Sequence, residues 1–148
     1  MRVQPSVGPV VERPRRCRKR TEPSKRRVPS QPPLPPVLES LFGVIAEPVW
    51  KLEAAPDGDL TLREIGILLG DVLDWLEEGP TILHAADRLY DVAFALQDAR
   101  QRQPTCASIT DRTLKACADA VPVALAAFRA SLSTAKPNAR ARARCLTW

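Results

Sequence analysis

The clearest hydrophobic pattern in the chain lies at residues 61–80. Apolar residues recur there at spacings of three and four, which places them on one side of an α-helix. These residues are Leu62, Ile65, Leu69, Val72 and Leu76. Thr61 and Glu64 have the spacing of a capping box, in which each side chain satisfies a backbone N–H of the first turn. Gly79 and Pro80 predict the helix end, with glycine in the left-handed conformation and proline preventing continuation.

Two more segments before residue 104 predict helices. Residues 37–52 are almost continuously apolar, and Pro48 within them predicts either a kink or two short helices. Residues 81–103 form the next helix, which Pro104 ends. Its stripe contains Ile82, Ala86, Leu89, Ala93 and Leu96, and it is widened by Leu83, Tyr90 and Phe94. A helix with such a wide apolar side is expected to contact two neighbours.

The last predicted helix begins after Thr110, which is placed as its N-cap. Pro122 should bend this helix. Its stripe contains Leu114, Ala118, Val121, Leu125, Phe128 and Leu132. No segment alternates with a period of two, and the connections are short. Residues 37–134 therefore predict an all-α domain, a small antiparallel bundle of about four helices with the first and last kinked at proline.

The charge divides the chain into three parts. Residues 1–30 carry a net charge of +8, residues 31–135 carry −7, and residues 136–148 carry +4. Nine of the fifteen prolines lie in residues 1–36, mixed with the basic clusters. Because proline removes backbone donors and like charges repel, we expect residues 1–36 to be disordered. We expect residues 135–148 to form a second, Arg-rich basic tail.

Two basic clusters in the N-terminal tail are candidates for contacts with phosphate groups or an import receptor. They contain Arg15, Arg16, Arg18, Lys19, Arg20, Lys25, Arg26 and Arg27. Clustered cations release counterions from nucleic acid and are also typical of nuclear-import signals. A tail that only increases solubility remains an alternative.

A proline motif follows these clusters. Its prolines are Pro29, Pro32, Pro33, Pro35 and Pro36. Such runs adopt the polyproline helix that docks in aromatic grooves, which is typical of an adaptor protein. A stiff spacer between tail and domain is the alternative interpretation.

The residues that catalysis or metal binding needs are scarce. The single histidine, His84, has no nucleophile placed beside it, and Asp57 and Asp59 lack the rest of a calcium loop. The four cysteines show no metal spacing and no disulfide framework. We therefore expect no enzyme activity, no catalytic residues, no metal and no cofactor.

The segment from Thr61 to Gly70 resembles the first helix and turn of helix-turn-helix DNA-binding domains, with a capped helix and a glycine at the turn. The resemblance implies that a recognition helix follows and that the protein is a transcription regulator. Asp71, Asp74 and Glu77 stand where such a helix would carry Arg, Gln, Asn or Ser, so the resemblance departs from the pattern there.

Gly66 and Gly70 lie four residues apart and hence on one side of their helix. Each costs about 1 kcal/mol relative to alanine, and they predict close helix–helix contact within the chain or with a second copy.

These patterns favour a non-enzymatic regulatory or accessory protein. Its bundle would bind a protein partner or itself, and its tails would bind nucleic acid non-specifically or direct nuclear import. No apolar run reaches the length of about 18 residues that spans a bilayer, so we expect no membrane association and an intracellular location. That location would be nuclear in a eukaryote or for a virus of one, and cytoplasmic otherwise.

Overall fold

The computed structural model describes Gly8 and residues 32–144, and the structural statements below concern this part of the chain. It is all-α, as the hydrophobic periodicity predicts. Its elements are α1 (Pro36–Lys51), the 3-10 helix η1 (Leu52–Ala54), α2 (Gly58–Leu73), α3 (Pro80–Arg102), α4 (Asp111–Leu132) and α5 (Ala139–Ala143). No strand forms among these residues, and only an isolated antiparallel bridge joins Leu76 to Pro137.

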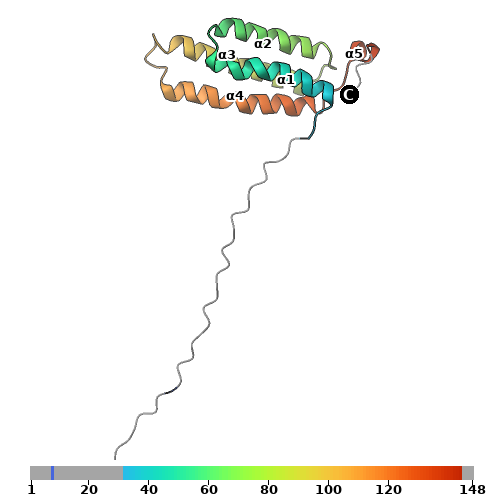
Figure 1. Ribbon diagram of the computed structural model, residues 1–148, viewed down its shortest axis with the longest axis horizontal. Coiled ribbons are helices and arrows are strands. Elements are labelled where there is room, and N and C mark those ends of the chain that lie inside the picture. The colour runs from blue at the N-terminus through green and yellow to red at the C-terminus, as the bar shows by residue number, and fades with distance from the viewer. Residues whose placement is uncertain (1–7, 9–31, 145–148) are drawn as a thin grey trace, which may run out of the picture. The chain divides into compact units, whose positions relative to one another are not determined.

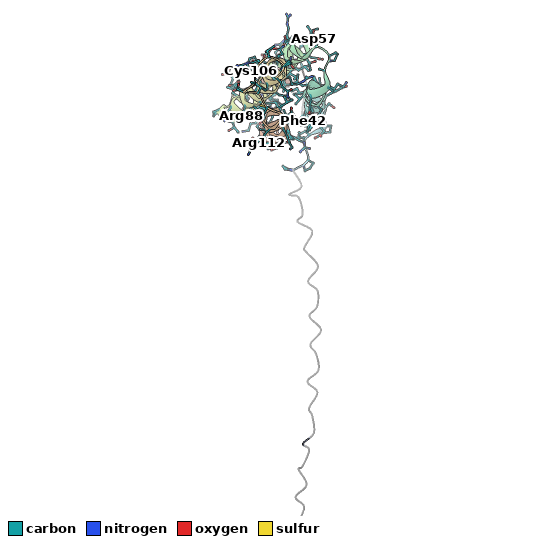
Figure 2. All side chains as sticks on the ribbon, turned by 90° about the vertical axis from the view of Figure 1, so that its left-hand side faces the viewer. Phe42, Asp57, Arg88, Cys106 and Arg112 are labelled. Carbon is teal, nitrogen blue, oxygen red and sulfur yellow. The ribbon has the colours of Figure 1, made fainter. Side chains whose placement is uncertain are left out.

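The four long helices lie side by side as a bundle (Figure 1). Both α1 and α3 pack against α2 and α4, so each helix has two neighbours. The connections between successive helices are short, which makes sequence neighbours antiparallel. Figure 2 looks along the bundle and labels Asp57 and Cys106, which belong to the connections before α2 and after α3.

The core is formed by the stripes that the sequence predicts. All five stripe residues of α3 are buried, and Leu62, Ile65, Leu69, Val72 and Leu76 are buried in and after α2. From α4, Phe128 and Leu132 are fully buried, and α1 adds Leu38, Ile45 and Val49. Burying one such side chain stabilises the fold by about 1.5–3 kcal/mol, so these stripes hold the bundle together.

The predicted start of α2 at Thr61 is wrong, because the helix begins one turn earlier. Asp57 is the N-cap, and its carboxylate accepts a hydrogen bond from the backbone N–H of Leu60 at 3.0 Å. Thr61 lies inside the helix, where its hydroxyl donates to the carbonyl of Asp57. Asp and Thr are both favoured at the N-cap, and Asp is the better of the two, which agrees with the cap at Asp57. Thr110 does cap α4, accepting from Thr113 N–H at 3.2 Å.

The predicted end of α2 at Gly79 and Pro80 is also wrong. The helix ends at Leu73, and residues 74–79 connect it to α3. Gly79 is the N-cap of α3 with φ −149°, which is extended and not left-handed, and Pro80 is the first residue of α3. Proline is favoured at that position because its missing N–H has no helical partner there.

Both interior prolines lie within continuous helices. Pro48 is in α1 and Pro122 in α4, so α1 does not divide into two short helices. Pro48 leaves the carbonyl of Val44 without its helical donor. Val44 is exposed, where water can replace that donor.

Residues 136–144 fold back onto the α2–α3 connection, although the sequence places them in a basic tail. The N–H of Glu77 donates to the carbonyl of Lys136 at 2.8 Å, and Asn138 N–H donates to the carbonyl of Trp75 at 3.0 Å. The Asn138 amide also donates to the carbonyls of Asp74 and Leu76, at 2.7 and 3.3 Å. Its oxygen caps α5 by accepting from Ala141 N–H at 2.9 Å. Asn138 therefore joins the two segments.

The alternation of Ala and Arg in α5 suits this position. Ala141 is fully buried, and the guanidinium groups of Arg140 and Arg144 lie 5.1 and 5.3 Å from the centre of the Trp75 ring. Arg142 pairs with Glu77 at 3.3 Å. Each cation–π contact contributes about 0.5–1 kcal/mol at an exposed site, so the basic residues hold α5 in place.

We predict that Asn138→Ala detaches residues 136–144 from the α2–α3 connection. The variant removes two donated hydrogen bonds and the cap of α5, worth about 1–2 kcal/mol together. Hydrogen exchange of the Glu77 amide should therefore accelerate about tenfold, while core amides of α3 stay unchanged. Asn138→Ser, whose hydroxyl oxygen can still cap α5 without setting a charge against these carbonyls, should show a smaller effect. Unchanged exchange at Glu77 in Asn138→Ala would contradict this role.

Candidate protein-binding groove

A groove of about 540 Å³ runs between α2 and α3. From α2 it is lined by Gly66, Leu69, Gly70 and Leu73, and from α3 by Ala86, Asp87, Tyr90 and Asp91. The volume lies within the range of about 300–1,000 Å³ that is typical of ligand pockets. The groove is open to solvent along its length, so it suits an extended partner surface better than a small molecule.

The two glycines of α2 differ in their surroundings. A Cβ atom at Gly66 would lie 3.1 Å from Cε2 of Tyr90, so the missing side chain lets α3 place its tyrosine against the backbone of α2. At Gly70 a Cβ atom would meet nothing within 4 Å. Within the chain, Gly66 thus allows a close contact, and Gly70 is an uncovered part of the groove.

Two large apolar side chains of α3 continue the side of the helix that lines the groove. Leu83, Tyr90 and Phe94 are spaced seven and four residues apart, which puts them along one side of α3 over about 16 Å. Leu83 and Phe94 are 40% and 53% exposed, although the sequence assigns them to helix contacts. Ile67 on α2 is 55% exposed but is not among the lining residues.

Two carboxylates, Asp87 and Asp91, line the groove one turn apart on α3. Asp71 and Asp74 are also exposed near the end of α2, but they are not among the lining residues. No ion pair among the described residues neutralises any of the four. Arg63, one turn before Gly66, is the basic residue of α2. The groove is thus apolar in its floor and acidic at its edge.

The site residues predicted from the tail are mostly outside the described part of the chain. This holds for Pro29 and for the basic residues Arg15, Arg16, Arg18, Lys19, Arg20, Lys25, Arg26 and Arg27.

The described prolines of the motif lead into α1. Pro32, Pro33 and Pro36 are exposed, but Leu34 between them is 8% exposed and belongs to the core. Pro35 and Pro36 are the N-cap and first residue of α1. This end of the motif is therefore fixed against the bundle.

The turn that the helix-turn-helix resemblance requires is absent from its expected place. Gly70 lies inside α2, which continues to Leu73. Since α2 and α3 are antiparallel neighbours, the second helix does not cross the first as a recognition helix would.

A second hollow of about 290 Å³ lies beside the start of α2 and is polar. The side-chain amides of Gln97 and Gln101 donate to Asp59, at 3.2 and 2.7 Å, and Arg100 donates to the carbonyls of Leu52 and Ala55. A Cβ atom at Gly58 would lie 1.9 Å from Oε1 of Gln97, so the Gln97 amide would have to move if this glycine were replaced. These polar groups hold each other, which indicates a structural role.

Other chemistry-bearing side chains are dispersed over the described residues. His84 is exposed, and no three His, Cys, Asp or Glu residues in this part of the chain lie close enough to hold a metal ion. The Cys106 thiol has a lowered pKa, chiefly because of its hydrogen bond with the Ser108 hydroxyl at 2.9 Å, but it stands alone. Among the described residues, no helix is sufficiently long and apolar to cross a bilayer.

Comparison with protein-family models, with curated proteins and with solved structures finds no match for this chain.

We predict opposite behaviour of the two groove glycines on substitution by alanine. Gly70→Ala should raise the free energy of unfolding by about 0.5–1 kcal/mol, because helix propensity improves and nothing obstructs the methyl group. Gly66→Ala should bring no such gain, because Tyr90 must move by a few tenths of an ångström. Urea unfolding of both variants measures the difference. Equal gains would show that Tyr90 does not pack on Gly66.

Proposed function

We propose that the protein is a non-enzymatic regulatory or accessory protein whose helical bundle binds a protein partner in the α2–α3 groove. The observation that carries the proposal is the pair of exposed apolar side chains, Leu83 and Phe94, on the side of α3 that lines the groove, together with the uncovered Gly70 of α2. Contiguous exposed apolar surface rimmed by polar residues marks interaction sites in soluble proteins. Self-association through the same groove is the alternative form of this proposal.

The basic N-terminal clusters supply the second half of the proposed function. A net charge of +8 within 30 residues supports non-specific nucleic-acid affinity or nuclear import, and with it an intracellular, nuclear location in a eukaryotic cell. A regulator that reads DNA through α2 is less well supported, because that helix ends in Asp71 and Asp74.

Two full-length variants separate these activities. In the first, the eight basic residues from Arg15 to Arg27 become glutamine; in the second, Gly70→Leu fills the groove. We expect the first variant to lose affinity for duplex DNA and RNA in fluorescence anisotropy, with the salt dependence of log K reduced by up to about 7. The second variant should bind nucleic acid like the wild type.

The groove is tested by capturing proteins from native cell extract after nuclease treatment. We expect wild type and the glutamine variant to retain the same protein, and Gly70→Leu to lose it. A captured set that is identical for all three chains, or that disappears with nuclease alone, would contradict the proposal.

A further inference from the structure

We infer that the α2–α3 groove binds a basic amphipathic helix of a partner protein. This inference rests on the proposed function and adds the chemistry of the partner. It follows from three features of the groove, which are its shape, its uncovered floor and the sign of its rim charges.

The shape favours a helix as the occupant. Two antiparallel helices form the walls, and a third helix can lie along such a groove with its apolar side inward. The exposed apolar side chains from Leu83 to Phe94 extend over about 16 Å, which equals three turns. A partner of this kind would place apolar residues at spacings of three, four and seven.

The floor has room for an inserted side chain at one level. Gly70 has no atom within 4 Å of a would-be Cβ, and it lies one turn from Gly66, where Tyr90 fills the equivalent space. Leu69 and Leu73 line the groove beside Gly70 on α2. An apolar side chain of the partner helix that rests on Gly70 would thus contact Leu73 and Tyr90 together.

The rim selects a partner of positive charge. Asp87 and Asp91 are spaced by four residues, so Lys or Arg residues one turn apart on an antiparallel or parallel helix can pair with both. Asp71 and Asp74 lie outside the groove lining but add negative charge near the end of α2. Opposite charges at a rim raise the association rate and reject partners of the wrong sign.

The same charges argue against a second copy of the chain as the occupant. A two-fold symmetric contact puts the same surface of both copies together. Here it would bring Asp87 and Asp91 of one copy toward those of the other. On α2, Arg63 is the one basic residue that could offset these charges. Like charges placed in this way weaken association.

Three synthetic 16-residue helices of identical apolar face test the inference on the full-length chain. They differ only in the flanking positions, which are all lysine, all glutamine or all glutamate. We expect the lysine helix to bind the wild type most tightly and the glutamate helix least, measured by calorimetry at physiological salt. Gly70→Leu, whose folding is verified by thermal unfolding, should abolish binding of the lysine helix.

The charge is tested by a matched pair of variants. Asp87→Asn with Asp91→Asn should weaken binding of the lysine helix about tenfold, since the two substitutions remove the acidic partners of two exposed ion pairs. Glu53→Gln with Asp119→Asn also removes two negative charges, but from η1 and α4, away from the groove, and should leave affinity unchanged. This second pair guards against a general attraction between a cationic peptide and an acidic domain.

Results that depart from these expectations would contradict different parts of the inference. Equal loss in both charge variants, or equal affinity of the lysine and glutamine helices, would overturn the basic partner while leaving the groove as a binding site. Binding of all three helices that is insensitive to Gly70→Leu would contradict the proposed function itself. A Gly70-dependent dimer in sedimentation equilibrium, with no helix bound, would identify a second copy as the occupant and overturn the inference.

Discussion

The contact between Gly66 and Tyr90 determines how α2 and α3 are joined. Because Gly66 has no side chain, the ring of Tyr90 lies against the backbone of α2. A Cβ atom at residue 66 would lie only 3.1 Å from Cε2 of Tyr90. One turn further along α2, no side chain of α3 fills the equivalent space, because a Cβ atom at Gly70 would meet nothing within 4 Å. The groove is the direct result of this change along two packed helices. Its floor contains glycine and leucine of α2, and the exposed Leu83 and Phe94 share the side of α3 that lines it.

The two ends of this helix pair are fixed by polar contacts. At the start of α2, Asp59 accepts hydrogen bonds from Gln97 and Gln101, and Arg100 binds the carbonyls of the preceding connection. Beyond the end of α2, Asn138 holds the carbonyls of Asp74 and Leu76, and the arginines of α5 lie over Trp75. With both ends held, the groove is an organised surface, which lowers the ordering cost that binding must overcome.

The sequence predicts the interior of this protein well, and it predicts the ends of α1 and α3 and the start of α4 to within one residue, but it misplaces both ends of α2. The stripes of α2 and α3 are buried as predicted, because apolar residues spaced by three and four lie on one side of an α-helix. The start of α2 is not predictable in the same way, since Asp57 and Thr61 are both good caps. Gly79 and Pro80 fit the end of one helix as well as the start of the next.

The groove and the folded-back α5 depend on contacts between distant parts of the chain. Leu83 and Phe94 look like core residues in sequence, and their exposure follows from where α2 and α4 pack on α3. The two glycines are the local signal that indicates the groove, but the sequence does not distinguish the filled position at Gly66 from the open one at Gly70. Likewise, the role of the alternating Ala and Arg residues after Asn138 depends on their contact with Trp75, which the sequence alone does not indicate.

A basic helix that docks in the α2–α3 groove should perturb the residues around it. Amide chemical-shift mapping of the isotopically labelled full-length chain, during titration with the lysine-flanked helix, tests this directly. We expect the largest changes on residues 66–74 and 83–94, with Gly70 among them. Changes centred on the facing surfaces of α3 and α4, around Ala95, Ala116 and Ala120, or spread evenly over the acidic residues, would contradict it.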